Sequence, residues 1–205
     1  MEIRLGKEND IESWMKLVAK VRDNFPGLET QAALGEHRNT VLDFISKDSA
    51  ICAKDKDKTV GTLLFSKENN VLCFLAVDAE YRRQHIAEKM VSYMLTFMDS
   101  QKDVTVATYR EGVPEGIAAR AFYKRIGFTE GKLTEEFGSP VQEFVLKAVD
   151  TMTVKVNCPC KKTKCERHGN CDACLAYHTG SKRKCACERT EKSILSHFKK
   201  LIHYS

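Results

Sequence analysis

The chain has 205 residues, of which 42% are hydrophobic and 30% are charged, and its formal net charge is +5. This length and composition are typical of a globular protein with one full domain and room for one small extra module. The longest apolar run has seven residues, which is too short for a membrane-spanning helix of about 20 residues. The N-terminus lacks the apolar core of a secretory signal, so we expect a cytoplasmic protein.

Charge and cysteine are divided unevenly along the chain. Residues 151–205 carry 12 Lys and Arg against 4 Asp and Glu, a net charge of +8, whereas residues 1–150 carry a net charge of −3. Seven of the nine cysteines fall between Cys158 and Cys187. Two compositions in one chain predict two modules, residues 1–149 and residues 150–205.

Hydrophobic periodicity and capping residues predict the elements of the first module in chain order. A strand at 2–5 comes first, then a helix capped at Asn9 or Asp10 that runs to Phe25, then a second helix capped at Thr30. The later elements are strands at 50–53, 59–65 and 71–77, a helix at 84–100, a strand at 104–109, a helix at 115–126 and a hairpin of 133–137 and 141–149. The predicted order is β-α-α-β-β-β-α-β-α-β-β, an α/β fold with a mixed sheet. The charged segment 54–58 is expected to be a solvated hairpin loop.

One stretch joins a strand to a turn that suits an anion. The seven apolar residues Val71–Val77 predict a strand buried on both faces, with Cys73 as a small core residue. Ile86, Met90 and Met94 recur at helical spacing and predict the apolar face of the next helix. Arg82 and Arg83 lie between the two elements, where the first N–H groups of the helix lack intrahelical partners and suit a phosphate.

This turn resembles the acyl-CoA-binding motif of the GNAT N-acetyltransferases, commonly written R/Q-x-x-G-x-G/A, in the residues Arg82-Arg83-Gln84-His85-Ile86-Ala87. Residues 119–128 are similar to a second family signature, in which an alanine precedes a Leu/Phe-Tyr pair, three further residues and Gly-Phe. The resemblance covers about residues 1–149. It implies the GNAT acyl-CoA-binding fold, acetyl-CoA as co-substrate, and acetyl transfer to a primary amine by direct attack in a ternary complex.

The resemblance also implies roles for individual residues. In such proteins the central strand splays from its parallel neighbour, and the pantetheine arm of CoA pairs with the exposed backbone, here that of Leu75 and Val77. Tyr123 matches the position of an acid that protonates the departing thiolate, and its alternative role is a buried structural tyrosine. The pyrophosphate is expected to contact the turn and the helix start, which comprise Arg82, Arg83, Gln84, His85, Ile86 and Ala87.

Two residues depart from the family pattern. His85 occupies the first glycine position of the phosphate turn. Because a helix-start dihedral does not require glycine, we expect the backbone to be tolerated there, and the side chain to crowd the phosphate or, if protonated, to assist it. Gly116 stands where many relatives carry asparagine. The general base is left open between Glu68 and Asp78, each of which has an alternative role as a surface or capping residue.

The second module is rich in cysteine and histidine. Cys165, His168, Cys171 and Cys174 recur at three-residue steps and predict a zinc site, with an iron–sulphur cluster as the alternative. The spacing matches no standard zinc finger. Disulfides, packed reduced thiols and disorder are the other interpretations, of which disulfides are disfavoured in a reducing cytosol. An amphipathic helix is expected over about residues 194–202.

Two function hypotheses follow from these patterns. The first is an acetyl-CoA-dependent N-acetyltransferase. The alternative is a non-catalytic acyl-CoA sensor, or a module that binds nucleic acid or protein through the basic, Cys-rich tail. The acceptor amine and the oligomeric state do not follow from the sequence, because substrate pockets are built from variable loops.

Overall fold

The structure, a computed structural model, describes residues 1–148, 160–162, 164–168, 174 and 177–178. Internal contacts divide the chain into two units, Met1–Ala148 and Val149–Ser205, and each is described by itself. Within the described residues, no helix is long and apolar enough to cross a membrane. The helix predicted over residues 194–202 lies outside the described residues.

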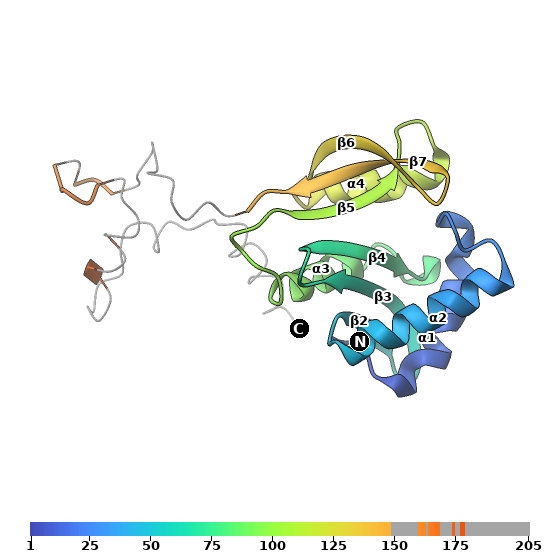
Figure 1. Cartoon of the computed structure of the whole chain (residues 1–205). Coiled ribbons are helices and arrows are strands. Elements are labelled where there is room, and N and C mark those ends of the chain that lie inside the picture. Colours follow the sequence, from blue (N-terminus) through green and yellow to red (C-terminus); the bar gives the residue numbers. More distant parts are fainter. Residues whose placement is uncertain (149–159, 163, 169–173, 175–176, 179–205) are drawn as a thin grey trace. The chain divides into compact units, whose positions relative to one another are not determined.

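A seven-stranded sheet forms the centre of the first unit, in the order β1-β2-β3-β4-β5-β7-β6 (Figure 1). Neighbouring strands are antiparallel except for β4 and β5, which are parallel, so the sheet is mixed as predicted. The strands are β1 Glu2–Leu5, β2 Ala50–Asp55, β3 Lys58–Ser66, β4 Val71–Val77, β5 Val104–Tyr109, β6 Thr129–Glu136 and β7 Ser139–Leu146.

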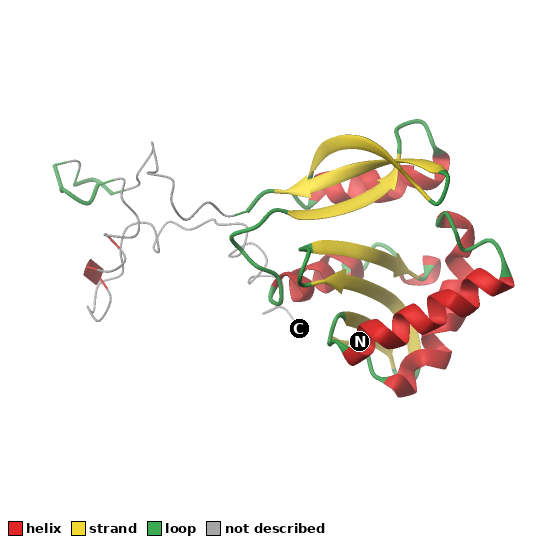
Figure 2. Ribbon diagram, viewed as in Figure 1, coloured by secondary structure: helices red, strands yellow, loops and turns green. Residues whose placement is uncertain are grey.

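Four α-helices cover the two faces of this sheet (Figure 2). Helices α1 (Ile11–Val21) and α2 (Gln31–Ser46) pack on one face through an apolar cluster that includes Trp14 and Phe74. Helices α3 (Ile86–Leu95) and α4 (Ile117–Arg125) pack on the other through a cluster that includes Met90 and Phe144. Short 3₁₀ helices lie at Glu8–Asp10, Arg22–Asn24, Ala79–Tyr81 and Pro114–Gly116. The predicted order of helices and strands is therefore confirmed.

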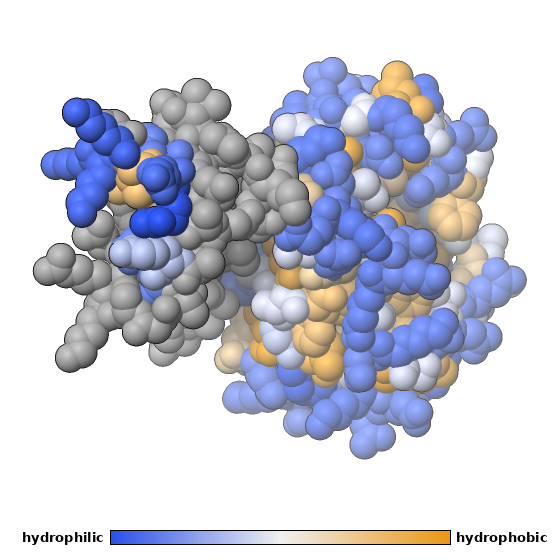
Figure 3. All heavy atoms as spheres, turned by 60° about the vertical axis from the view of Figure 1, so that its left-hand side comes forward, coloured by the Kyte–Doolittle hydropathy of each residue, from blue (hydrophilic) through white to orange (hydrophobic). Residues whose placement is uncertain are grey.

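The surface of this unit is mostly polar, as Figure 3 shows for one face. Ile117, Leu133 and Phe137 are large apolar side chains that remain exposed, Phe137 to 80%. Phe137 lies at the tip of the β6–β7 hairpin, and its ring contacts Gly27 in the α1–α2 connection, since a Cβ at Gly27 would lie 3.0 Å from Cγ of Phe137. This contact links two connections that are far apart in the sequence.

Several element boundaries differ from the prediction because local backbone geometry decides them. Helix α1 ends at Val21, and a 3₁₀ turn continues to Asn24. Helix α3 begins at Ile86 and ends at Leu95, which makes it shorter than the predicted 84–100. The final hairpin turns at Phe137 and Gly138, whose φ angles are 50° and 72°, so Ser139 and Pro140 belong to β7. The Thr30 cap is confirmed, because its hydroxyl accepts the N–H of Ala33 at 3.1 Å.

The prediction that β4 is buried on both faces, with Cys73 in the core, was wrong. Cys73 is exposed, whereas Leu72, Phe74 and Ala76 are buried. Leu64 of β3 pairs with Phe74, but the next residue, Phe65, pairs with Leu72. Cys73 is therefore skipped in the ladder and forms a β-bulge. An unbroken apolar run conceals such a bulge, because the residues on both sides of it are apolar.

A buried ionic cluster joins β1, β2 and the start of α1. Asp10 accepts hydrogen bonds from the Arg4 guanidinium at 2.7 and 3.0 Å, from Lys54 Nζ at 3.1 Å and from the N–H of Lys7 at 2.9 Å. Burial by itself would raise the pKa of Asp10, but these donors hold it below its ordinary value. The side chain of Asp10 makes no capping hydrogen bond to α1. Lys54 is only 8% exposed, which corrects its expected place in a solvated loop.

Replacing Asp10 with asparagine leaves two cations without their buried counter-charge. We expect Asp10→Asn to lower the free energy of unfolding at pH 7 by about 3 kcal/mol, measured by urea denaturation. Folding lowers the pKa of Asp10 from its value of about 4 in the unfolded chain. The carboxylate therefore stabilises the fold fully above about pH 4, and this stabilisation is lost as the pH falls toward the pKa of Asp10 in the folded protein. The difference between wild type and variant should therefore shrink below about pH 4. A difference that stays constant down to about pH 3 would contradict this linkage.

Candidate functional site

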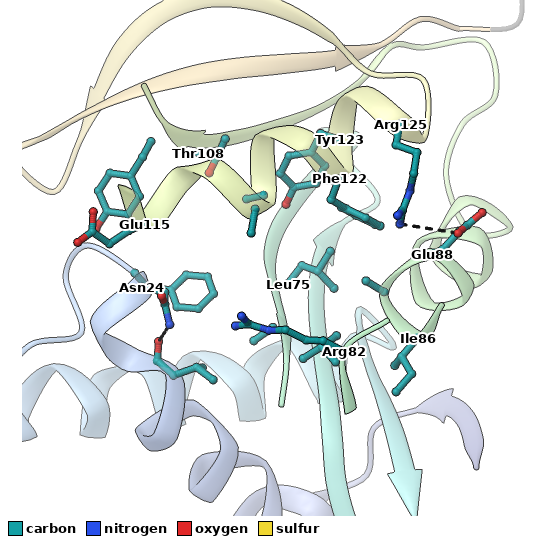
Figure 4. Close-up of a pocket in the computed structure, with 18 of the residues that line it drawn as sticks. Asn24, Leu75, Arg82, Ile86, Glu88, Thr108, Glu115, Phe122, Tyr123 and Arg125 are labelled. Carbon is teal, nitrogen blue, oxygen red and sulfur yellow. Dashed lines mark hydrogen bonds and ion pairs between the residues drawn. The ribbon is translucent and has the colours of Figure 1, made fainter. Parts of the chain in front are cut away.

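A cleft of about 640 Å³ lies against β4 and β5 and between α3, α4 and the α1–α2 connection (Figure 4). Seven of the eight residues expected at the CoA site line it, and only Gln84 does not. Tyr123 lines it as well. The structure therefore brings the two predicted signatures to one cavity. The residues of the expected CoA site on its wall are Leu75, Val77, Arg82, Arg83, His85, Ile86 and Ala87.

The cleft exists because β4 and β5 part from each other. Val71 opposite Thr105 is the one register pair between these strands in residues 1–148, and the Thr105 N–H donates to Asn70 O at 3.0 Å. The bulge at Cys73 lies two residues after Val71, and beyond it β4 and β5 no longer form a ladder. Each strand keeps its antiparallel partner on the outer side, β3 for β4 and β7 for β5.

Leu75 and Val77 present unpaired backbone groups at this gap. In an antiparallel ladder, alternate residues bond to the partner strand and the others point away from it. The Asp78 N–H donates to the carbonyl of Val60 at 2.9 Å, so Ala76 also faces β3. Leu75 and Val77 consequently direct their N–H and C=O groups toward β5, where residues 1–148 supply no ladder partner.

The N-terminus of α3 reaches the same cleft. The first helical hydrogen bond joins the Lys89 N–H to the His85 carbonyl at 3.0 Å. The N–H groups of Ile86, Ala87 and Glu88 therefore precede the regular ladder and can bind an anion. Helix α3 approaches β3 closely at Gly61, where a Cβ would lie 2.8 Å from Met90 Sδ. The absence of a side chain at Gly61 thus allows α3 to lie against the sheet at this position.

The expectation that His85 adopts a helix-start conformation was wrong. Its φ and ψ angles are 58° and 18°, in the left-handed region, and Arg83 also has a positive φ of 60°. Histidine is among the non-glycine residues that tolerate this region better than most, although the conformation is strained. The two left-handed residues explain why α3 begins at Ile86 and not at residue 84.

A small ionic network holds the side chain of His85 beside the cleft. His85 Nδ1 lies 3.0 Å from Glu88 Oε2, and Arg125 Nη2 lies 3.9 Å from the same oxygen. Glu88 thus lies between a residue of the α3 turn and a cation from the last turn of α4, as Figure 4 shows for Glu88 and Arg125. The sequence did not predict Arg125 as a residue of the cleft, although Arg125 lies inside the second signature. The signature does not indicate that the last turn of α4 lies at the cleft.

Tyr123 directs its hydroxyl into the cleft (Figure 4). Its side chain is 5% exposed, and its ring packs against Phe128 and Phe144 at centroid distances of 5.6 and 5.9 Å. No residue of 1–148 forms a hydrogen bond with the hydroxyl. Burial raises the pKa of Tyr123 above its ordinary value, because the phenolate would lose its hydration. The phenol is therefore protonated at neutral pH.

Two contacts fix α4, which carries Tyr123, to the sheet. Arg120 donates to the carbonyl of Tyr109 at 3.2 Å, to Gln142 at 2.7 Å and to Glu130 at 2.6 Å. Gly116 lies so close to β5 that a Cβ would be 2.7 Å from Cβ of Tyr109. A side chain at position 116 would clash with Tyr109, which gives a physical reason for glycine at a position where many relatives carry asparagine.

Neither suggested general base lines the cleft. Asp78 is buried, and it bonds to Lys20 Nζ at 2.8 Å and to Lys58 Nζ at 3.1 Å. Burial alone would raise the pKa of Asp78, but the two lysines lower it, which makes the carboxylate a weak proton acceptor. It also accepts the N–H of Glu80 as the cap of a 3₁₀ turn. Glu68 lies in the β3–β4 turn, at the opposite end of β4 from Val77.

The predicted metal site is described only in part, because Cys171 lies outside the described residues. Cys165 and His168 share one turn, in which the His168 N–H donates to the Cys165 carbonyl at 2.8 Å. The ring Nε2 of His168 lies 3.0 Å from the carbonyl of Cys160. Among the residues that the structure describes, no group of three or more His, Cys, Asp or Glu side chains is arranged to hold a metal ion.

Comparisons with known proteins agree with this fold. Residues 46–130 match the family profile of the acetyltransferase (GNAT) domain. An N-acetyltransferase from Staphylococcus aureus Mu50 is 16% identical with a TM-score of 0.57, over 71% of this chain and 100% of that chain. A GNAT-family acetyltransferase from Bacillus cereus ATCC 10987 is 18% identical with a TM-score of 0.57, over 72% and 97%.

A third similar structure is RimL, a ribosomal L7/L12 α-N-protein acetyltransferase in complex with coenzyme A. It is 14% identical with a TM-score of 0.53, and the match covers 71% of this chain and 92% of that chain. A comparison with curated protein sequences gives no match. At these identities the three structures establish the fold alone.

The strained backbone of His85 can be tested by glycine substitution. Because glycine adopts positive φ without steric cost, we expect His85→Gly to keep the free energy of unfolding or to raise it by up to about 1 kcal/mol in urea denaturation. Gln84→Gly is the matched control, since Gln84 has no positive φ and glycine there adds only unfolded-state entropy. The control should lose about 0.5–1 kcal/mol. An equal loss in both variants would disprove the strain at His85.

Proposed function

Because residues 46–130 match the profile of the acetyltransferase (GNAT) domain, we propose that this chain is an acetyl-CoA-dependent N-acetyltransferase that acts on a primary amine. The observation that carries the proposal is the parting of β4 from β5. It turns the backbone of Leu75 and Val77 toward a cleft that also receives the N-terminus of α3. An extended chain with amide groups, such as pantetheine, can pair with strand backbone of this kind.

The turn before α3 supplies the groups that a pyrophosphate requires. The first N–H groups of the helix and its dipole favour an anion. Arg82 and Arg83 border the same wall of the cleft, and a guanidinium binds phosphate oxygens through charge-assisted hydrogen bonds. Arg125 reaches this wall from α4, so it is a further candidate for a phosphate contact. The proposed CoA thus has its phosphates at α3 and its thioester between the two strands.

The proposed reaction is a direct acyl transfer. The lone pair of a neutral amine attacks the thioester carbonyl carbon, a C–N bond forms, the C–S bond breaks, and CoA departs as a thiolate. The amine nitrogen gives up one proton and the thiolate takes up one, so the products are an N-acetylamine and CoA thiol. Starting from an ammonium ion, the overall reaction releases one proton to solvent.

Tyr123 is our candidate for the proton donor to the thiolate. Its raised pKa keeps the phenol protonated at neutral pH, and its hydroxyl has no competing partner in residues 1–148. In water the thiolate of CoA, whose thiol has a pKa of about 8.5, would be a weak base for a phenol. Burial raises the pKa of a thiol as it raises that of Tyr123, so exclusion of water from the cleft makes the thiolate a stronger base and offsets the raised pKa of the phenol.

A thiol-release assay with acetyl-CoA and a panel of primary amines tests the enzyme against the sensor alternative. We expect CoA thiol to appear only when an amine is present. We further expect Tyr123→Phe to lower kcat about 100-fold, the order of a lost general acid, while the Kd for acetyl-CoA changes less than about twofold.

Tyr93→Phe is the control for this variant, because Tyr93 of α3 packs on Phe97, does not line the cleft and should keep full activity. Acetyl-CoA binding without turnover on any amine would favour the non-catalytic sensor. Unchanged kcat in Tyr123→Phe would remove the acid role and leave Tyr123 as a structural residue.

For the tail, we propose that Cys165, His168, Cys171 and Cys174 bind zinc, with an iron–sulphur cluster as the alternative. Support comes from His168, because a hydrogen on Nε2 bonded to the Cys160 carbonyl leaves Nδ1 to face a metal. Metal-binding histidines commonly hold their second ring nitrogen in this way. A short segment with little apolar content would gain folding energy from the ion.

Elemental analysis of untagged protein purified under reducing conditions tests the zinc site. We expect about one zinc per chain in the wild type and none in Cys165→Ser. Cys73→Ser is the control and should keep the zinc, because Cys73 lies in β4. A metal content near zero in the wild type would disprove the site. Iron and inorganic sulphide in place of zinc would identify the cluster instead.

A further inference from the structure

The charged side chains that line the cleft indicate which class of amine could accept the acetyl group. Building on the proposed function, we propose that the acceptor is a small aliphatic diamine or polyamine, in which a second ammonium group binds beside Glu115 while the first amine reacts. The step is the acyl transfer described above, so the bonds, electron pairs and protons balance in the same way. The second nitrogen takes no part in it.

The two ends of the cleft differ in charge. Arg83, His85 and the N-terminus of α3 line the end proposed for the phosphates. Figure 4 places Glu115 and Asn24 at the other end, with Leu75 and Tyr123 between the ends. Arg82 also extends into the cleft, and Figure 4 shows its guanidinium turned toward Asn24. In the proposed complex this side chain contacts the pyrophosphate, which offsets its charge. Glu115 then supplies the charge at the remaining opening.

A second carboxylate, Glu29, acts on the same tyrosine as Glu115 but does not line the cleft. Burial raises the pKa of Tyr109, and the negative charges of Glu115 and Glu29 raise it further, so both carboxylates lie near this phenol. Within residues 1–148, neither Glu115 nor Glu29 forms an ion pair with a lysine or arginine. The pKa of Glu29 is lowered by its own backbone N–H and by the N–H of Gly27, which it accepts at 2.9 Å. Glu115 is therefore the carboxylate on the cleft wall that lacks a counter-ion and favours a cation at this end.

The neighbouring groups suit an alkylammonium ion in particular. Asn24 donates its amide N–H to the Val21 carbonyl at 3.1 Å, which leaves the amide oxygen as an acceptor. Phe25, Pro26 and Tyr109 provide apolar and aromatic wall around it. Methylene groups can lie on this wall while the ammonium meets carboxylate and amide oxygens. A carboxylated acceptor would be repelled by the same residues.

The position of the carboxylate indicates that it binds an amine that does not react. Attack requires a neutral nitrogen, and a carboxylate beside that nitrogen would stabilise its ammonium form and raise its pKa. Tyr123 marks a separate place for the reacting atoms. Its side chain is only 5% exposed, its hydroxyl has no hydrogen-bond partner in residues 1–148, and it points into the cleft (Figure 4). Glu115 at the end and Tyr123 between the ends therefore suit two nitrogens of one molecule.

The decisive experiment compares putrescine with butylamine in the thiol-release assay at saturating acetyl-CoA. The two amines have the same carbon chain, and only putrescine carries a second ammonium group. We expect kcat/KM to be roughly fivefold to tenfold higher for putrescine, as for a partly exposed ion pair, and we expect the ratio to fall as salt is added. Spermidine should behave like putrescine.

Glu115→Gln should remove most of the preference by lowering kcat/KM for putrescine about fivefold and changing that for butylamine less than about twofold. Glu111→Gln is the matched control, since Glu111 is exposed in the same β5–α4 connection and does not line the cleft. Equal turnover of putrescine and butylamine, a preference that survives Glu115→Gln, or faster turnover of a peptide N-terminus would overturn this inference alone. No turnover with any amine, despite acetyl-CoA binding, would overturn the proposed function and the inference with it.

Discussion

The missing ladder between β4 and β5 is the constraint on which the rest of the first unit depends. A sheet normally satisfies every interior N–H and C=O by pairing, and a buried group left unpaired is costly. Here the pairing of β4 with β5 ends after Val71, beside the bulge at Cys73, and the open backbone of Leu75 and Val77 faces a cleft of about 640 Å³. The groups that cannot pair within the sheet become the groups that can bind a ligand.

Side chains hold the sheet together where backbone hydrogen bonds do not. One apolar cluster includes Leu72 of β4, Met94 of α3, Val104 of β5 and Phe144 of β7, so it crosses the line along which the strands part. The second cluster, on the α1 and α2 face, draws its strand residues from β2, β3 and β4 only. The β5–β7–β6 half of the sheet is thus attached mainly through α3 and α4, which are the helices that carry the candidate phosphate turn and Tyr123. Packing and site geometry are consequently coupled in these two helices.

Charge is used differently in the core and in the cleft. Asp10 is buried, and four donors surround it, which is the arrangement that makes a buried carboxylate tolerable. Glu115 lines the cleft and has no ion-pair partner in residues 1–148. The same contrast appears in the backbone, because Arg83 and His85 keep left-handed conformations beside the cleft. Locally unfavourable features of this kind tend to gather at functional sites, where the surrounding fold maintains them.

The sequence by itself determined the order of helices and strands, the mixed sheet and the two signatures that meet at one cleft. These features follow from hydrophobic period, capping residues and short motifs, all of which act over a few neighbouring residues. The bulge at Cys73, the burial of Lys54 beside Asp10 and the left-handed His85 were decided only by tertiary structure. Each depends on a partner strand, a distant carboxylate or a packed helix that no local pattern encodes. Arg125 and Glu115 lie on the wall of the cleft for the same reason, because the positions of α4 and of the connection before it place them there.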